Sequence, residues 1–251
     1  MKAVLIRSVD PGRIVDLSHD LRPHAVVEAA FLVRAMAERF PPGTIHVVVV
    51  DPGVGGRRAG LAIECADGSL LVGPDNGVLW PLAEALGFRR AVRLAPVSGL
   101  GAARAGTTFD GRDLFAPAAA ALAAGRRITA LGPPQSPEVL RLPTPTLRPD
   151  TATGEIVHID RFGNLITNLP SDTVPAEVHR MLVRVGRGRN RRLPRATSYE
   201  ALGPGRLGVI GSSFGLLELS VSHGRAEERL GARVGTPVRI DWRRRHTAGE
   251  R

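Results

Sequence analysis

The sequence predicts an α/β protein with two domains: a layered, mainly parallel α/β domain over residues 1–145 and a smaller β-rich domain over residues 152–243. Three observations predict this. Apolar runs typical of strands alternate with segments of helical periodicity as far as residue 124. Prolines are then frequent between Pro133 and Asp150, which indicates a domain boundary. Beyond this boundary the pattern changes to short strands separated by turns.

Each element of the first domain has its own signal. Met1–Ser8 has the pattern of the last turns of a helix, and Arg13–Leu17 that of a strand. From His24 to Phe40 the apolar residues recur at helical spacing, and the sequence Pro41-Pro42-Gly43 ends that helix. The pair Asp67-Gly68 indicates a hairpin turn. We expect strands at 47–50, 59–64, 69–72 and 91–94, and two further helices at 78–86 and 114–124.

The second domain is expected to consist mainly of strands, because its apolar segments are short and are separated by turns. An α/β domain ordinarily begins with a strand, whereas this chain begins with a helical pattern. We therefore expect that a first strand precedes Met1 in the natural protein. The strands expected in the second domain are at 154–160, 164–168, 181–185, 207–210, 216–221 and 237–241.

Composition limits the class of protein. The chain has 251 residues, enough for a sizeable core, and its mean hydropathy is near zero. No segment approaches the roughly 18 apolar residues of a membrane span, and the N-terminal sequence MKAVLIRSVD is too short and too polar for a signal peptide. Cys65 is the only cysteine and lies in an apolar run, so we expect a buried, inert thiol. These features predict a cytoplasmic protein without a membrane partner.

The chain is strongly basic. Its formal net charge is +10 and its isoelectric point is about 11.4, which is compatible with an anionic partner. However, Lys2 is the only lysine among the 34 basic residues, and this arginine excess accompanies many alanines and glycines across the whole chain. The densest basic segments, Arg184–Arg195 and Arg243–His246, are not interleaved with aromatic residues and match no nucleic-acid-binding module. We therefore do not expect a nucleic-acid partner.

The main functional signal is the segment His46–Arg58, with the sequence HVVVVDPGVGGRR. The run Val47–Val50 is typical of a strand that is buried on both faces. Asp51 and the arginine pair Arg57-Arg58 follow it, and in an open α/β sheet the residues past the carboxyl end of a strand line the ligand crevice. Two interpretations remain open at this point: a functional site with Asp51 and the arginines, or a tight loop with a solvated ion pair.

Four further polar clusters interrupt apolar segments: Gly73–Gly77, Thr107–Asp113, Asp160–Asn168 and Gly211–Glu218. Taken singly, each has a structural explanation. The second can cap a helix, and the others can be turns or a bulge. The seven histidines show no metal-ligand spacing, and no glycine-rich loop matches a dinucleotide or P-loop pattern.

Together, these clusters resemble one family. The strings VVVVDPGVG, GPDNG, TTFDGRDLFAPAAA, IDRFGNLITN and SSFGLLELSV, in this order, look like the adenosine-forming S-adenosylmethionine hydrolases. These are also called SAM hydroxide adenosyltransferases and are related to the fluorinases and chlorinases. The resemblance extends from residue 1 to about residue 241. It implies an N-terminal α/β domain, a C-terminal β-barrel-like domain, and a homotrimer whose sites lie between the N-terminal domain of one subunit and the C-terminal domain of the next.

The resemblance also implies a reaction, in which S-adenosylmethionine (SAM) and water give adenosine and methionine without a metal or redox cofactor. The family's catalytic aspartate and arginine correspond to Asp51 and Arg58. The family's histidine corresponds to Asp110, so Asp110 either takes its place or only caps the helix that begins near Gly111. The residues that correspond to substrate contacts, together with a phenylalanine that could pack against the ligand, are Phe162, Asn164, Ser213, Phe214, Glu218 and Val221.

These residue types suit the reaction. Because the sulfonium makes methionine a good, neutral leaving group, the protein needs only to place water in line with ribose C5′ and to exclude other water. Asp51 can accept a proton from that water, and Arg58 can hold the Asp51 carboxylate. The alternative is a SAM- or adenosine-binding protein of the same fold that has lost catalysis, because Asp110 and the absent first strand both depart from the family pattern.

Overall fold

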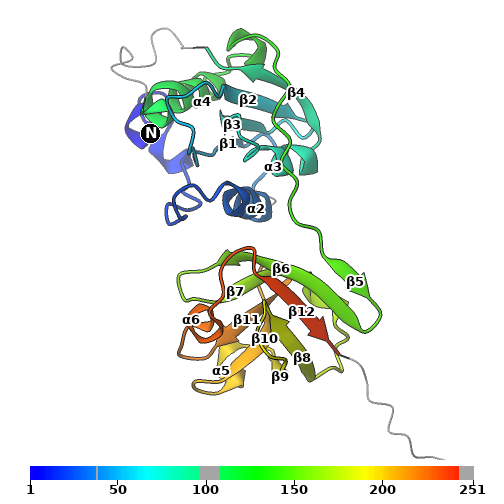
Figure 1. Cartoon of the computed structure of the whole chain (residues 1–251). Coiled ribbons are helices and arrows are strands. Elements are labelled where there is room, and N and C mark those ends of the chain that lie inside the picture. Colours follow the sequence, from blue (N-terminus) through cyan, green and yellow to red (C-terminus); the bar gives the residue numbers. More distant parts are fainter. Residues whose placement is uncertain (38, 96–107, 243–251) are drawn as a thin grey trace, which may run out of the picture. The chain divides into compact units, whose positions relative to one another are not determined.

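The computed structural model of the chain describes residues 1–37, 39–95 and 108–242 (Figure 1). The chain divides into two compact units, Met1–Leu142 and Pro143–Arg251. Unit 1 contains a four-stranded sheet with helices, and unit 2 contains a β-barrel. Thr107 and the basic segment Arg243–His246 lie outside the described residues.

The sheet of unit 1 has the strand order β1-β3-β2-β4. β1 (Ile45–Val47) and β3 (Leu70–Pro74) are parallel, whereas β2 (Gly60–Cys65) is antiparallel to both β3 and β4 (Phe88–Arg93). The α/β class is confirmed, but the expected mainly parallel pairing is wrong for the described strands. The reason is local: β2 and β3 are joined by the tight Asp67-Gly68 turn, and so short a connection can join only antiparallel strands.

Helices cover both faces of this sheet. Successive side chains of a strand point to opposite faces, so Leu61 and Ile63 of β2 join one core layer while Ala62 joins the other. α2 and α3 pack in the first layer, and η2 and α4 pack in the second. None of the helices in the described residues is long and apolar enough to cross a membrane. The helical elements of unit 1 are α1 (Lys2–Leu5), η1 (Pro11–Arg13), α2 (Val26–Ala37), α3 (Trp80–Ala85), the π-helical turn η2 (Gly111–Phe115), α4 (Ala116–Ala123) and η3 (Ile128–Ala130).

Two expectations for the start of unit 1 are corrected. The strand expected at 13–17 is wrong, since η1 occupies 11–13 and no strand precedes β1 in the described residues. Val15 is 64% exposed, so this segment offers no buried face to a sheet. The strand expected at 47–50 lies earlier in the chain, since β1 begins at Ile45 and ends at Val47, although the Val48 N–H still donates to the Val72 carbonyl at 2.9 Å.

Unit 2 contains a closed barrel of seven strands in the order β12-β8-β9-β10-β11-β7-β6, in which β6 also pairs with β12. The expected β-barrel-like domain is therefore confirmed. Alternate side chains fill the interior, where Leu165, Val209, Leu217 and Leu219 are fully buried. Closure gives every barrel strand a partner on both sides. The strands of unit 2 are β5 (Thr146–Arg148), β6 (Thr151–Ile159), β7 (Leu165–Pro170), β8 (Arg180–Val185), β9 (Arg191–Ala196), β10 (Leu207–Gly211), β11 (Leu216–Val221) and β12 (Pro237–Asp241).

The sequence pattern does not indicate β5, β9 or the short helical elements of unit 2. β9 has the sequence RRLPRA, in which arginines and Pro194 interrupt the apolar pattern. Its one large apolar side chain, Leu193, is nevertheless buried in the barrel core. β9 forms because β8 and β10 supply its hydrogen-bond partners, and local sequence does not record that pairing. The helical elements of unit 2 are η4 (Ser171–Thr173), α5 (Tyr199–Leu202) and α6 (Ala226–Leu230).

Cys65, the only cysteine, is completely buried at the end of β2, as expected. Burial, assisted by the nearby Asp67 and Glu64 carboxylates, raises the pKa of its thiol to about 12. Because the thiolate is the reactive form, we expect the native protein not to react with 5,5′-dithiobis(2-nitrobenzoate) near pH 8, and one thiol per chain to react after unfolding in guanidinium chloride. The Cys65→Ala variant is the control. Rapid reaction of the native protein would contradict the burial of this thiol.

Candidate active site

The loop after β1 carries a buried ion pair between Asp51 and Arg58. Arg58 Nε donates to Asp51 Oδ1 at 2.7 Å, and Arg58 Nη2 donates to the other carboxylate oxygen, so the contact is bidentate. The side chains of Asp51 and Arg58 are only 6% and 12% exposed. The alternative of a tight loop with a solvated ion pair is therefore wrong, because solvation would require both side chains to lie in water.

Asp110 joins this pair from a distant part of the chain. The same Arg58 Nη2 donates to Asp110 Oδ2 at 2.7 Å, and the Asp110 side chain is 8% exposed. Asp110 directly precedes η2, but its side chain forms no capping hydrogen bond there. The interpretation of Asp110 as only a helix cap is therefore wrong, since its carboxylate binds Arg58. The three predicted catalytic residues thus lie in one cluster.

Packing holds the Arg58 guanidinium between the two carboxylates. Its Cζ lies 5.3 Å from the centre of the Phe115 ring, which is within cation–π range. Its Nη1 donates to the Ala59 carbonyl at 3.1 Å. Phe115 can lie this close because Gly60 has no side chain: a Cβ at Gly60 would lie 2.9 Å from the ring. The start of β2 and the end of η2 therefore position the guanidinium together.

The GPDNG segment at 73–77 holds both ends of the loop that carries Asp51 and Arg58. Asn76 Nδ2 donates to the Val50 carbonyl at 2.9 Å, directly before Asp51. The backbone N–H of Asp75 donates at 2.9 Å to the carbonyl of the residue after Arg58. Asn76 is therefore a positioning residue for the cluster. The interpretation of this segment as ordinary turn chemistry missed that role, because the contact joins residues 26 positions apart.

The cluster suits proton transfer. Two carboxylates around one guanidinium carry a net negative charge, and a carboxylate can accept a proton from a bound water. A negative site favours a cationic substrate and disfavours a halide ion. Within the described ranges, no group of His, Cys, Asp and Glu side chains has an arrangement that could hold a metal ion.

Unit 2 contains a pocket of about 330 Å³ that is lined by parts of α5, β10 and β11. Three of the predicted substrate contacts, Ser213, Phe214 and Glu218, line it. Ser213 and Phe214 lie in the turn between β10 and β11, whereas Glu218 is buried on β11 and accepts a hydrogen bond from Ser220 Oγ at 2.9 Å. The structure therefore brings these three residues together.

The other three predicted contacts lie elsewhere in unit 2. Asn164 is buried, and its Nδ2 donates at 3.0 Å to Asp160, a residue of the pocket lining. Phe162 lies in the same turn, is 59% exposed and contacts the Arg161 guanidinium. Val221 is buried in the barrel core. The roles of all six residues in substrate binding stay predictions.

Tyr199 is a pocket residue that the sequence patterns do not indicate. It lies in α5 and lines the pocket together with Glu218. Partial burial and the nearby Glu218 carboxylate raise the pKa of the Tyr199 phenol well above its usual range. The phenol therefore stays protonated. The only feature of the sequence that could have drawn attention to Tyr199 is that it is the single tyrosine of the chain.

Family models match both units. The model described as the SAM hydroxide adenosyltransferase N-terminal domain matches residues 1–132, and the one described as the C-terminal domain matches residues 154–239. The cluster of Asp51, Arg58 and Asp110 lies within the first match. The pocket of unit 2 lies within the second.

The chain is similar to curated relatives over nearly its whole length. It is 40% identical over 243 residues to the (R)-S-adenosyl-L-methionine hydrolase of Salinispora tropica, and this match covers 94% of the chain and 89% of the relative. It is 39% identical over 248 residues to the protein of the same name from Thermus thermophilus, with coverages of 96% and 92%. A fluorinase of Actinoplanes sp. is 30% identical over 193 residues, with coverages of 66% and 64%.

Solved structures agree with this assignment. A crystal structure of an uncharacterized conserved protein from Thermotoga maritima matches with a TM-score of 0.85 at 32% identity, covering 96% of this chain and 93% of the other. A crystal structure of a conserved hypothetical protein from Thermus thermophilus matches with a TM-score of 0.73 at 36% identity, with coverages of 95% and 91%. With both units matched by the family models and the site residues inside those matches, the chain belongs to the SAM hydroxide adenosyltransferase family.

Proposed function

We propose that this protein hydrolyses S-adenosyl-L-methionine to adenosine and L-methionine. The observation that carries the proposal is the buried cluster of Asp51, Arg58 and Asp110. Sequence similarity supports the same reaction, because relatives named (R)-S-adenosyl-L-methionine hydrolase are 38–40% identical to this chain over nearly its whole length. The fluorinase match is more distant and covers about two-thirds of the chain.

The reaction is a displacement at the ribose C5′ carbon. The water oxygen forms a bond to C5′ while the C5′–S bond breaks, and methionine leaves with the electron pair as a neutral thioether. The leaving group needs no proton, because the substrate's positive charge already lies on sulfur. Placing one water in line with the C5′–S bond and excluding other water then lowers the barrier by several kcal/mol.

Asp51 is the proposed proton acceptor. The proton of the attacking water passes to an Asp51 oxygen, and the Arg58 fork holds that carboxylate in one orientation. Asp110 shares Arg58 Nη2 and adds a second negative charge beside the reacting centre. This charge favours the sulfonium and disfavours a halide nucleophile, which argues for hydrolysis rather than halogenation.

Unit 2 is proposed to bind the substrate. Its pocket of about 330 Å³ lies in the size range of small-molecule sites.

The proposal includes a homotrimer whose sites lie between neighbouring subunits. It requires no metal or redox cofactor, since displacement from a sulfonium needs neither. It also includes a cytoplasmic location, which the lone buried thiol fits. The residues of unit 2 that are proposed to contact the substrate are Phe162, Asn164, Ser213, Phe214, Glu218 and Val221.

Loss of the proton acceptor is the first test. We expect Asp51→Ala and Asp51→Asn to lower the rate of adenosine formation by at least about 100-fold, because neither side chain can accept the proton of the attacking water. The full chain is incubated with SAM, supplied separately in its (R) and (S) sulfonium forms, and adenosine and methionine are quantified by chromatography. The native protein should release both in equal amounts. Asp172→Asn removes an exposed carboxylate of unit 2 and should leave the rate unchanged.

Two results would overturn this proposal. A native rate in Asp51→Ala would remove the mechanism. A native protein that releases no adenosine from either form of SAM, yet is thermally stabilised by SAM or adenosine, would instead be a binding protein that has lost catalysis. The observation that favours this second function is the carboxylate of Asp110 at the family's histidine position.

The identity of residue 110 gives a second prediction. Asp110→His should preserve or raise kcat, because a histidine can relay a proton and no longer places a second carboxylate on Arg58. Asp110→Ala is the comparison, since it removes the same charge without supplying a proton relay. Equal losses of kcat in the two variants would show that a histidine at this position does not support the reaction in this chain.

Asn76 gives a third prediction. Asn76→Ala removes the donor to the Val50 carbonyl, so the Asp51 carboxylate is free to shift relative to the substrate. We expect kcat to fall about 10- to 100-fold with little change in KM, because small displacements of a catalytic group are costly. The control is Gln135→Ala, which removes a hydrogen bond from Gln135 Nε2 to the Asp75 carboxylate in the GPDNG segment. Lower thermal stability with an unchanged kcat would assign Asn76 a purely structural role.

A further inference from the structure

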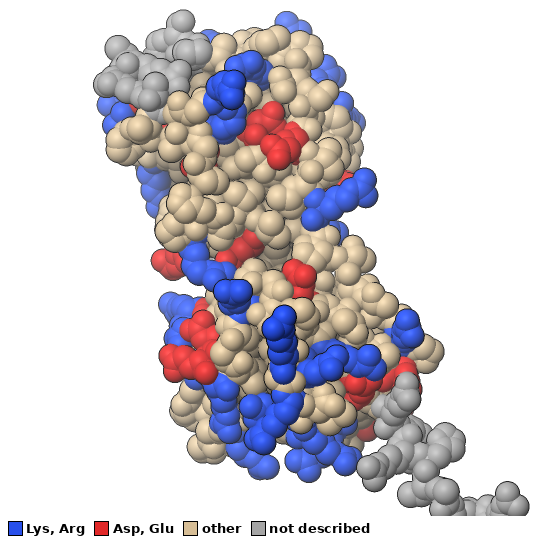
Figure 2. All heavy atoms as spheres, viewed as in Figure 1, with Lys and Arg blue, Asp and Glu red and all other residues tan. Residues whose placement is uncertain are grey.

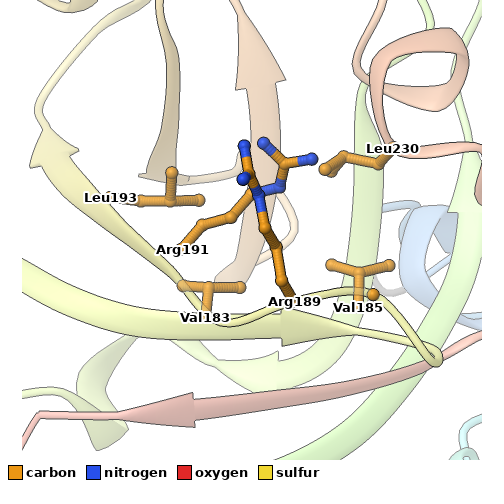
Figure 3. Close-up of a pocket in the computed structure, with 7 residues that line it drawn as sticks. Val183, Val185, Arg189, Arg191, Leu193 and Leu230 are labelled. Carbon is orange, nitrogen blue, oxygen red and sulfur yellow. The ribbon is translucent and has the colours of Figure 1, made fainter.

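Two arginines of unit 2 meet in a small pocket that the proposed reaction does not use. Arg189 lies in the turn between β8 and β9, and Arg191 is the first residue of β9. Both line a pocket of about 30 Å³. Figure 3 shows the two guanidinium groups close together, with apolar side chains around them. These apolar side chains belong to Val183, Val185, Leu193 and Leu230.

Neither guanidinium has a counter-charge among the residues that the structure describes. In residues 1–37, 39–95 and 108–242, neither Arg189 nor Arg191 forms an ion pair with a carboxylate. The surrounding sequence offers none, since residues 180–196 contain seven arginines and no aspartate or glutamate. Among these arginines, Arg195 is occupied by hydrogen bonds to three backbone carbonyls. Within the described part of the chain, the pair is therefore a cationic site without an internal anion.

A second pair of neighbouring arginines in the same barrel has a counter-charge from the protein itself. Arg184 of β8 lies directly opposite Arg239 of β12, and like charges in that position destabilise a sheet. Arg239 is neutralised by Asp241, to which its Nε and Nη2 donate at 3.0 and 2.9 Å. Arginine side chains gather over the barrel surface (Figure 2), and their combined field raises the local concentration of anions. In the ranges that the structure describes, Arg189 and Arg191 have no partner equivalent to Asp241.

We propose that Arg189 and Arg191 form a binding site for a phosphate-type oxyanion. Two guanidinium forks present several donors to the oxygens of one tetrahedral anion. A phosphate monoester carries about −1.5 to −2 charges at neutral pH and so balances both arginines, whereas a carboxylate balances only one. The pocket of about 30 Å³ has room for no more than part of an oxyanion, so any group attached to the anion stays outside. The site therefore recognises the phosphate and not the molecule that carries it.

Calorimetric titration of the full chain tests this site. Inorganic phosphate, glycerol 3-phosphate and adenosine 5′-monophosphate are titrated at constant ionic strength against a chloride blank. We expect one site per chain, with dissociation constants that agree within about threefold because only the phosphate is recognised. Arg189→Gln combined with Arg191→Gln should weaken binding at least tenfold. Arg126→Gln combined with Arg127→Gln, which removes the same charge from two exposed arginines of unit 1, should leave it unchanged.

Several outcomes would overturn the proposal. Equal weakening in both double variants would indicate general charge attraction instead of a site. Binding of a DNA oligonucleotide or of phosphatidylglycerol vesicles without binding of the small phosphates would identify an extended surface for that polymer or membrane. Thermal stability is the second readout: in phosphate-free, low-salt buffer the Arg189/Arg191 double variant should unfold at the same or a higher temperature, because two like charges are removed. A clear fall would assign the pair a structural role.

Discussion

The guanidinium of Arg58 is the group on which the rest of the active cluster depends. It binds Asp51 through two nitrogens and Asp110 through a nitrogen that both carboxylates share, although Asp110 lies 52 residues away in the sequence. All three side chains are nearly buried, so removal of Arg58 would take away the cation that both carboxylates share. The absence of a side chain at Gly60 leaves room for the Phe115 ring, which lies against this guanidinium.

The scaffold holds this cluster from three separate segments of chain. The loop after β1 carries Asp51 and Arg58, the turn before η2 carries Asp110, and the GPDNG segment holds the loop at both of its ends. The close approach of the GPDNG segment requires a glycine, since a Cβ at Gly73 would lie 2.3 Å from the Val48 carbonyl oxygen. In unit 2 the barrel strand β11 carries Glu218, and Ser220 Oγ donates a hydrogen bond to its carboxylate.

Charge is distributed unevenly over this basic chain. The net charge is +10, yet the cluster around Arg58 contains two carboxylates and a single guanidinium. A sulfonium substrate and a phosphate-type anion would therefore be attracted to different places, the first to this cluster and the second to Arg189 and Arg191. Asp110 contributes to this division, because it places a second carboxylate on the Arg58 guanidinium.

The sequence by itself determined the strands other than β5 and β9 and the helices α1 to α4, and it singled out Asp51, Arg58 and Asp110. The valine run before Asp51, the helical periodicity of α2 and the short strands of unit 2 follow from local periodicity, which each segment records independently. Only the tertiary structure decided which strands pair, and it made β2 antiparallel to its neighbours. It also decided that Asp110 binds Arg58 instead of capping η2, and that Asn76 and Tyr199 belong to the sites. These contacts join residues far apart in the chain, and local patterns of polarity do not specify which distant side chains meet.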